Sequence, residues 1–129
     1  MNERIFDLED RLIGFASRII DVVEALPNTQ AGIYVGGQLI RCGLAPALLY
    51  GEAQAAESRD DFIHKMKIAL KELKETRVCL KLIQKKEMIK PLSKMNAIMQ
   101  ENEELIAINS KSVNTAKQNI VKTKKSFGS

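Results

Sequence analysis

Apolar residues recur every three or four positions along most of the chain, and this spacing predicts four helices. The first helix is expected over residues 3–25, before Pro27 and Asn28, which are typical of a stop and a turn. The second is expected to begin after Thr29, a suitable N-cap, and to end between residues 51 and 57. The predicted apolar face of the first helix consists of Phe6, Leu12, Ile13, Ala16, Ile19, Ile20 and Val23.

The third and fourth expected helices show the same spacing. Ser58 and Asp61 have the form of a capping box in front of the third helix, residues 59–86. Pro91 suits the first turn of the fourth helix. The third helix carries Phe62, Ile63, Met66, Ala69, Leu70, Leu73, Leu80 and Ile83 on one side. The fourth carries Leu92, Met95, Ile98, Met99, Leu105 and Ile106, with Glu101, Glu103 and Glu104 outside.

After Asn109 the apolar spacing fades and serine, asparagine, threonine and lysine dominate. The sequence therefore predicts a bundle over residues 1–109 and a basic, frayed or disordered C-terminal tail over residues 110–129. No segment competes as a strand, because a single short one around Val35 could not form a sheet. The predicted fold class is all-α: an antiparallel up-down-up-down four-helix bundle.

The second helix contains an unusually apolar stretch, residues 39–52, whose first eleven residues include one charge, Arg41. A helix that is apolar all round has to be covered by other helices or by copies of the chain. We expect Arg41 to pair with an acid, either Glu52 or one on another helix, or else to line a polar opening. Gly36 and Gly37, in the same helix, predict close approach of a neighbour.

A second apolar group lies on the far side of the third helix. Ile68, Val78, Cys79 and Leu82 project within about 100° of each other at 3.6 residues per turn. A helix with two apolar faces either lies at the centre of the fold or packs against another subunit. We favour the second interpretation, which makes these four residues a predicted oligomer interface.

Charge is distributed unevenly. The formal net charge is +4, but residues 111–129 contain five lysines and no acid, which leaves −1 for the rest. On the third helix, basic residues also recur at one-turn spacing, and Glu72 and Glu75 are expected to neutralise them in part. Such a stripe either binds phosphates or solubilises the surface. The candidate nucleic-acid-binding residues are Arg41, Lys67, Lys71, Lys74, Arg77, Lys81, Lys85, Lys117, Lys122, Lys124 and Lys125.

No residue set predicts catalysis. His64 is the one histidine, so neither a zinc site nor a carboxylate–histidine di-iron site is expected. Cys42 and Cys79 do not form a CxxC pair, and we expect both to be small buried hydrophobic residues. We therefore expect no enzyme activity, no cofactor and no metal. No apolar run approaches the roughly 20 residues of a membrane span, so a cytoplasmic protein without membrane contact is predicted.

Two blocks resemble a known family. Residues 38–52, QLIRCGLAPALLYGE, resemble the central block of the bacterial four-helix-bundle proteins related to the 23S ribosomal RNA intervening-sequence family. Arg41 falls on the second arginine of that block, and Gly51 lies near its Ala-Glu-Gly turn. Residues 61–75 resemble the second block of the family, although Lys71 and Glu72 replace its usual Gly-Ser. The similarity extends over about residues 10–90.

This resemblance implies a four-helix bundle that assembles as a ring-shaped homopentamer. Relatives include the accessory protein of diversity-generating retroelements, which binds a reverse transcriptase and is basic enough to engage nucleic acid. The expected function is thus a non-enzymatic homo-oligomer that binds RNA, DNA or a ribonucleoprotein partner. The alternative is a protein-interaction module, an accessory or scaffold subunit that binds a reverse transcriptase or another protein and makes no contact with nucleic acid.

Overall fold

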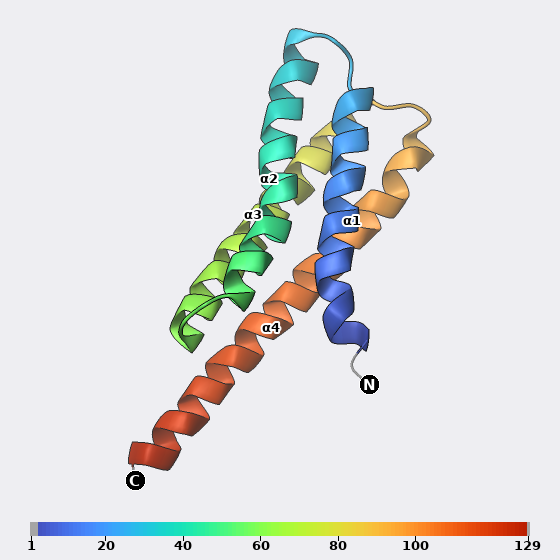
Figure 1. Cartoon of the computed structure of the whole chain (residues 1–129). Helices are drawn as coiled ribbons and strands as arrows, with labels where there is room; N and C mark the ends of the chain where they lie inside the picture. Colours follow the sequence, from blue (N-terminus) through green and yellow to red (C-terminus); the bar gives the residue numbers. More distant parts are fainter. Residues whose placement is uncertain (1–2, 129) are drawn as a thin grey trace.

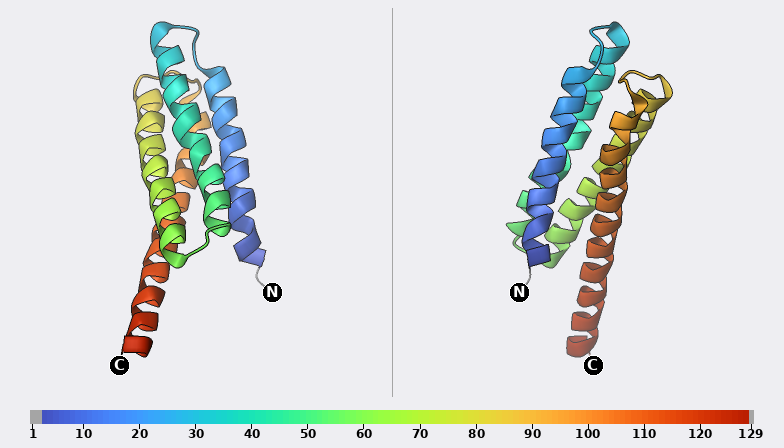
Figure 2. Two further views of the ribbon diagram at one scale, coloured as in Figure 1. Left: turned by 60° about the vertical axis from the view of Figure 1, so that its left-hand side comes forward. Right: turned by 90° about the vertical axis from the view of Figure 1, so that its right-hand side faces the viewer.

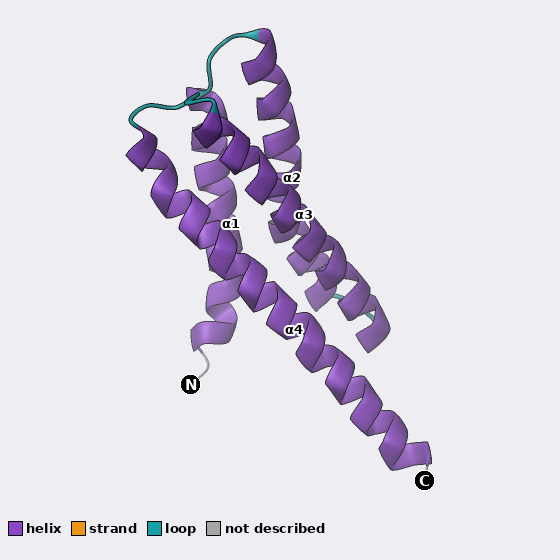
Figure 3. Cartoon of the chain, turned by 180° about the vertical axis from the view of Figure 1, so that it is seen from behind, coloured by secondary structure: helices purple, strands orange, loops and turns teal. Residues whose placement is uncertain are grey.

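The computed structural model describes the backbone of residues 3–128 and the side chains of residues 8–121. Four long helices make up most of it: α1 (Glu3–Ala25), α2 (Gln30–Gln54), α3 (Arg59–Lys85) and α4 (Asn96–Gly128). A short 3-10 helix, η1 (Leu92–Met95), precedes α4. No strand occurs in this part of the chain (Figure 3). The predicted all-α class and its four helices are confirmed.

Two helices begin where the sequence predicts a cap. The hydroxyl oxygen of Thr29 accepts a hydrogen bond from the backbone amide of Gly32 at 3.0 Å. In the same way, the hydroxyl of Ser58 accepts one from the amide of Asp61 at 3.0 Å. Each bond satisfies an amide that has no partner inside its own helix. The fourth helix begins later than predicted, because Pro91 precedes η1 and the α-helix starts only after it.

α4 continues as a helix to Gly128, whereas the sequence predicts a frayed or disordered tail after Asn109. Val113 and Ala116 are both buried and continue the inward-facing row of α4 beyond Asn109. This burial supports the helix where propensity alone predicts fraying. Its last part extends past the ends of the other three helices (Figure 3). The side chains of Lys122, Lys124 and Lys125, on this extension, lie outside the described residues.

The helices lie side by side, with the α1–α2 loop and the α3–α4 connection at one end and the α2–α3 loop at the other (Figure 1). The most extensive contact is between α2 and α3, followed by those between α3 and α4 and between α1 and α2. The contact between α1 and α4 is the least extensive of the four between neighbouring long helices, and these two helices diverge toward the end that carries the N-terminus (Figure 2). The bundle is therefore open along the α1–α4 side.

The core forms where the four helices face each other. On α3, Ile63, Met66, Ala69, Leu73, Leu80 and Ile83 are buried, as predicted. On α1, the buried residues are Leu12, Phe15 and Ile19. The predicted face of α1 is therefore partly wrong: Ile13 and Ile20 are exposed, and Phe15 takes their place. The side chain of Phe6, which belonged to that predicted face, lies outside the described residues.

The close approach between α1 and α2 occurs at Gly43. A Cβ atom there would lie 2.7 Å from Cγ2 of Ile19, closer than packed carbon atoms come. Of the two glycines for which the sequence predicts close packing, Gly36 is tight against Val23, but Gly37 faces open space. Close packing is therefore confirmed for one of them and wrong for the other.

By length and composition, α2 is the one helix in the described region that could cross a membrane. Helices in the cores of other proteins pass the same test, and α2 contributes the buried residues Leu39, Cys42, Pro46 and Tyr50 to this bundle.

Candidate nucleic-acid interface

Five lysines on the outer side of α3 form a basic surface. Lys67, Lys71, Lys74, Lys81 and Lys85 are all exposed. At 100° per residue they fall within an arc of roughly 80°, and at 1.5 Å per residue they span roughly 27 Å. Among residues 8–121, none of the five forms an ion pair. We call these five residues the lysine face.

Arg77, which the sequence places in the same stripe, has a different environment. Its guanidinium lies 3.1 Å from a carboxylate oxygen of Glu103 on α4, and its side chain is half-buried. Arg77 also lines a groove of about 490 Å³ between α3 and α4, together with Lys81, Gln84 and Gln100. Arg77 therefore helps to join the two helices and adds less than a full charge to the lysine face.

Arg41 bridges α2 and α3. Its guanidinium donates hydrogen bonds to Glu72, at 3.1 Å, to Glu75, and to Gln38 of its own helix at 3.3 Å. Desolvation acts to lower the pKa of Arg41, but the two carboxylates outweigh it and raise the pKa above its ordinary value. The predicted pairing with an acid on another helix is confirmed. Glu52, the other predicted partner, instead lies 2.8 Å from the ammonium of Lys65.

This pairing changes the charge of the α3 surface. The sequence suggests that Glu72 and Glu75 neutralise the lysine stripe in part, but both acids turn toward α2 and bind Arg41. At 100° per residue, Glu72 points roughly 160–180° away from Lys74 and Lys81, and Glu75 points roughly 100–120° away from them. The lysine face therefore keeps more positive charge than the sequence predicts.

The remaining candidate basic residues are on α4. Lys117 is exposed, as is Lys111 on the preceding turns. Lys122, Lys124 and Lys125 lie further along the same helix, on the extension past the bundle. These basic residues are on α4, whereas the lysine face is on α3.

Apolar side chains also reach the surface on α2 and α3. Of the four predicted interface residues, Val78 is 64% exposed and Leu82 is 46% exposed, whereas Ile68 and Cys79 are half-buried. α2 is covered on one side only, by α1 and α3. Its outer side exposes Ile33, Tyr34, Ile40 and Leu48. We call these four residues, with Val78 and Leu82, the apolar face.

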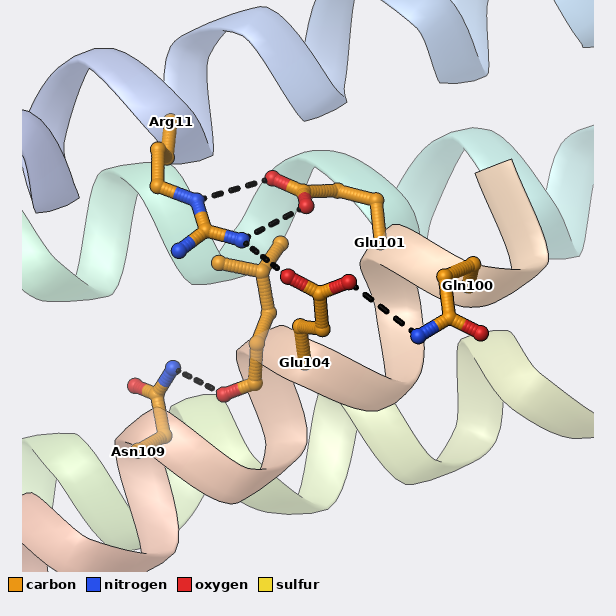
Figure 4. A network of polar contacts seen from close by, with 6 residues as sticks. Arg11, Gln100, Glu101, Glu104 and Asn109 are labelled. Atoms are coloured by element: carbon orange, nitrogen blue, oxygen red, sulfur yellow. Dashed lines mark hydrogen bonds and ion pairs between the residues drawn. The ribbon is translucent and has the colours of Figure 1, made fainter. Parts of the chain in front are cut away.

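A polar network joins α1 to α4 and was not predicted from the sequence (Figure 4). Arg11 donates to both carboxylate oxygens of Glu101, at 3.1 and 2.7 Å, and to Glu104 at 3.1 Å. The bond to Glu101 contributes most to raising the pKa of Arg11. Gln100 and Arg11 together lower the pKa of Glu104. These acids, which we expected to be a solvated face, hold two helices together.

Two buried asparagines on α4 were also missed. Asn102 donates to the carbonyl of Leu73 on α3 at 3.1 Å, and Asn109 donates to the carbonyl of Leu105 at 2.7 Å. The side-chain carbonyl of each has no hydrogen-bond partner. Both occupy inward positions seven residues apart, in line with Met95 and Ile98. That register could have identified them from the sequence.

The structure offers no catalytic cluster among the residues it describes. His64 is exposed on α3. No group of three or more histidine, cysteine or acidic side chains could hold a metal ion in this region. An open groove of about 1470 Å³ lies where α1 and α4 diverge, lined by Leu8, Tyr50, Phe62, Ile108 and Ala116 among others. Its lining is mainly apolar, so it resembles a packing surface more than a reaction site.

Comparison with known proteins identifies the family. The family model described as 23S rRNA-intervening sequence protein matches residues 7–111. The chain belongs to this family. The match includes the whole lysine face and stops before Lys117, so the extension of α4 lies outside the region shared with the 23S rRNA-intervening sequence proteins.

A solved relative has the same fold. It is a crystal structure of a protein of unknown function from the S23 ribosomal protein family of Bacteroides thetaiotaomicron. The sequences are 31% identical, the TM-score is 0.75, and the match covers 81% of this chain and 96% of the relative. No curated protein matches the sequence.

Proposed function

We propose that this protein is a non-enzymatic, antiparallel up-down-up-down helical bundle that forms a homo-oligomer and binds structured nucleic acid, or a ribonucleoprotein, in the bacterial cytoplasm. The single observation that carries the binding proposal is the lysine face on α3. Its five ammonium groups are exposed and, among residues 8–121, free of carboxylate partners. A row of such charges can replace the counterions condensed on a phosphate backbone.

Two further observations support binding to nucleic acid. The family to which the chain belongs is described as 23S rRNA-intervening sequence protein, and this description links the family to ribosomal RNA. The basic extension of α4 supplies a second set of lysines at a distance from the first. Contacts by lysine to phosphates position a protein without reading sequence. We therefore propose recognition of backbone and shape rather than of a base sequence.

The apolar face supports the homo-oligomer. Ile33, Tyr34 and Leu48 are each about two-thirds exposed on α2, and Val78 is equally exposed on α3. Contiguous exposed apolar residues mark surfaces that contact another protein. A helix as apolar as α2 is normally buried on all sides. Other copies of the chain would bury its exposed outer side. The family resemblance suggests five copies in a ring.

A binding assay tests the nucleic-acid proposal. Fluorescence anisotropy of labelled structured RNA and of duplex DNA is measured against the full chain from 50 to 200 mM salt. Binding whose log affinity falls steeply with log salt concentration supports contacts to several phosphates. A chain that ends at Asn109 distinguishes the lysine face from the extension of α4. Absence of binding to both ligands at 50 mM salt would overturn the proposal.

The alternative is a protein-interaction module, and the apolar face is the observation that favours it. In this reading an accessory or scaffold subunit binds a reverse transcriptase or another protein partner, and the lysines only solubilise the surface. Such binding would have a defined stoichiometry and a weaker dependence on salt, because apolar contacts are not screened.

A further inference from the structure

The groove between α3 and α4 borders the lysine face. Its volume of about 490 Å³ lies within the roughly 300–1,000 Å³ that is typical of small-molecule sites. Lys81 belongs to both features, because it is one of the five lysines and also lines the groove. A phosphate backbone that followed the lysine face would therefore pass the opening of this groove.

Four side-chain carboxamides line the groove. Gln84 comes from α3, and Asn96, Gln100 and Asn102 come from α4. A carboxamide carries a donor and an acceptor side by side, as the edge of a nucleobase does. Gln100 donates its amide nitrogen to Glu104 at 3.1 Å, which leaves its oxygen to accept another bond. The groove thus offers both kinds of hydrogen-bonding group.

Asn102 forms the inner wall of the groove, since it is 1% exposed. Its Nδ2 donates to the carbonyl of Leu73 at 3.1 Å, whereas its Oδ1 is shielded from solvent and has no hydrogen-bond partner among the described residues. A buried carbonyl without a partner is costly, and a donor that entered the groove would remove this cost. The missing partner is a donor, so the groove favours a ligand that presents an amino group.

The other lining groups suit the rest of a nucleotide. Leu80 is buried and Met99 is half-buried, and both offer apolar contact to the face of a ring. Arg77 is held by Glu103 and presents a planar guanidinium, a group on which unpaired bases stack. Lys81 is exposed and can contact a phosphate.

We propose that the groove between α3 and α4 binds one unpaired nucleotide whose base carries an exocyclic amino group, with its phosphate at Lys81 and its amino group at Oδ1 of Asn102. The inference rests on the proposed binding of nucleic acid along the lysine face and adds one docked base to it. Bases in loops and bulges of RNA can leave the stack and enter such a site. One base contact does not read a sequence, so recognition remains mainly of backbone and shape.

Two mononucleotides of nearly equal size test the inference with the full chain. Cytidine monophosphate carries an amino group at position 4 of its base, whereas uridine monophosphate carries an oxygen there. Each is titrated into isotope-labelled protein, and the backbone amide shifts are followed by NMR. We expect saturable shifts at Gln84 and Asn102, and an affinity for the cytidine nucleotide about five- to tenfold higher, as one added hydrogen bond provides. Equal affinities, or no saturable shift up to about 10 mM, would overturn the proposal.

Three variants locate the binding. Asn102→Leu removes the unpaired oxygen and should abolish the preference for the cytidine nucleotide. Gln84→Met should weaken its binding about fivefold. Gln118→Met, the same change at an exposed position of α4 outside the groove, should leave the affinity unchanged. Equal effects of the two glutamine variants would show that the nucleotide binds elsewhere. The comparison of the two nucleotides in the wild type decides the proposal even where Asn102→Leu folds poorly.

This titration can fail separately from the RNA assay. If structured RNA binds and neither mononucleotide does, the groove is not a base site and the proposed function stands. If the cytidine nucleotide binds at the groove and structured RNA does not, the site takes free nucleotides and the proposed function fails.

Discussion

α2 and α3 share the most extensive helix contact in the molecule, yet their outward sides differ in chemistry. The outer side of α2 is apolar, with Ile33, Tyr34 and Leu48 exposed and Arg41 as its main charge. The outer side of α3 combines two apolar residues, Val78 and Leu82, with the lysine face. The two helices are joined at the surface by the ion pairs of Arg41.

This difference suggests that the apolar residues and the lysines bind different kinds of partner. An apolar surface gains free energy by losing water to another protein, whereas exposed ammonium groups gain by releasing counterions from phosphates. Because Glu72 and Glu75 bind Arg41, they neutralise the lysine face less than their positions in the sequence suggest.

The largest effect is expected on the apolar face. Leu48→Glu and Leu82→Glu each place a carboxylate where the homo-oligomer would bury an apolar side chain, which is costly without a partner. In a closed ring one substitution recurs at every interface. Size-exclusion chromatography with light scattering should show a mass close to that of one chain, 14.4 kDa, for both variants.

Ser93→Glu is the matched control, since Ser93 is exposed in η1 and the added charge is the same. It should keep the mass of the wild type. An unchanged mass for both leucine variants would show that the apolar face is not the interface.

A smaller effect is expected from the inner side of α2. Gly43→Ala places a methyl group against Ile19 and should lower the free energy of unfolding by about 1–3 kcal/mol. Gly37→Ala, on the outer side of the same helix, meets no atom within 4 Å and should raise it by up to about 1 kcal/mol. Urea denaturation followed by circular dichroism measures both. Equal effects in the two variants would refute the packing at Gly43.

The next prediction concerns the lysine face. Combining Lys71→Gln with Lys74→Gln should lower the slope of log affinity against log salt by about 2 for a structured RNA, since each lost phosphate contact contributes about 1. Arg18→Gln with Arg59→Gln removes the same charge from exposed positions on α1 and at the start of α3. If both pairs of substitutions change the slope equally, net charge and not the lysine face governs binding.

Much of this fold could be predicted from the sequence, because caps and apolar spacing are local signals. Thr29 and Ser58 mark their helices correctly, and the core row of α3 is buried as expected. The continuation of α4 through Val113 and Ala116 was not predicted, because both are buried by tertiary contacts that helix propensity does not register.

The candidate site was predicted less completely, because it depends on which helices face each other. Spacing identified the five lysines but could not show that Arg77 pairs with Glu103 or that Glu72 turns toward α2. Spacing also could not show that Asn102 would donate to the carbonyl of Leu73 on α3, since no motif links the two residues. Such pairings arise only after the helices have packed.

The smallest effect on stability is expected from Arg41→Met, which removes the ion pairs that join the two helices but keeps most of the apolar stem. Exposed pairs contribute little, so the melting temperature should fall less than in Gly43→Ala, and the difference should shrink at high salt. A clearer readout is Cys79, which faces Cys42 and Arg41 on α2 and Glu75 on its own helix. In the wild type, the rate of alkylation by iodoacetamide should rise with a midpoint near pH 7, as the Cys79 pKa of about 7 requires.

Loss of the guanidinium removes a charge that favours the thiolate and leaves Glu75 unpaired, and both changes raise the pKa of Cys79. The midpoint should therefore move upward in Arg41→Met, while Lys74→Met, a cation removed from the lysine side of α3, should leave it in place. A midpoint that stays near pH 7 in both variants would show that the hydrogen bond from Cys42 alone sets the reactivity of Cys79. It would also show that the ion pairs between α2 and α3 have no part in it.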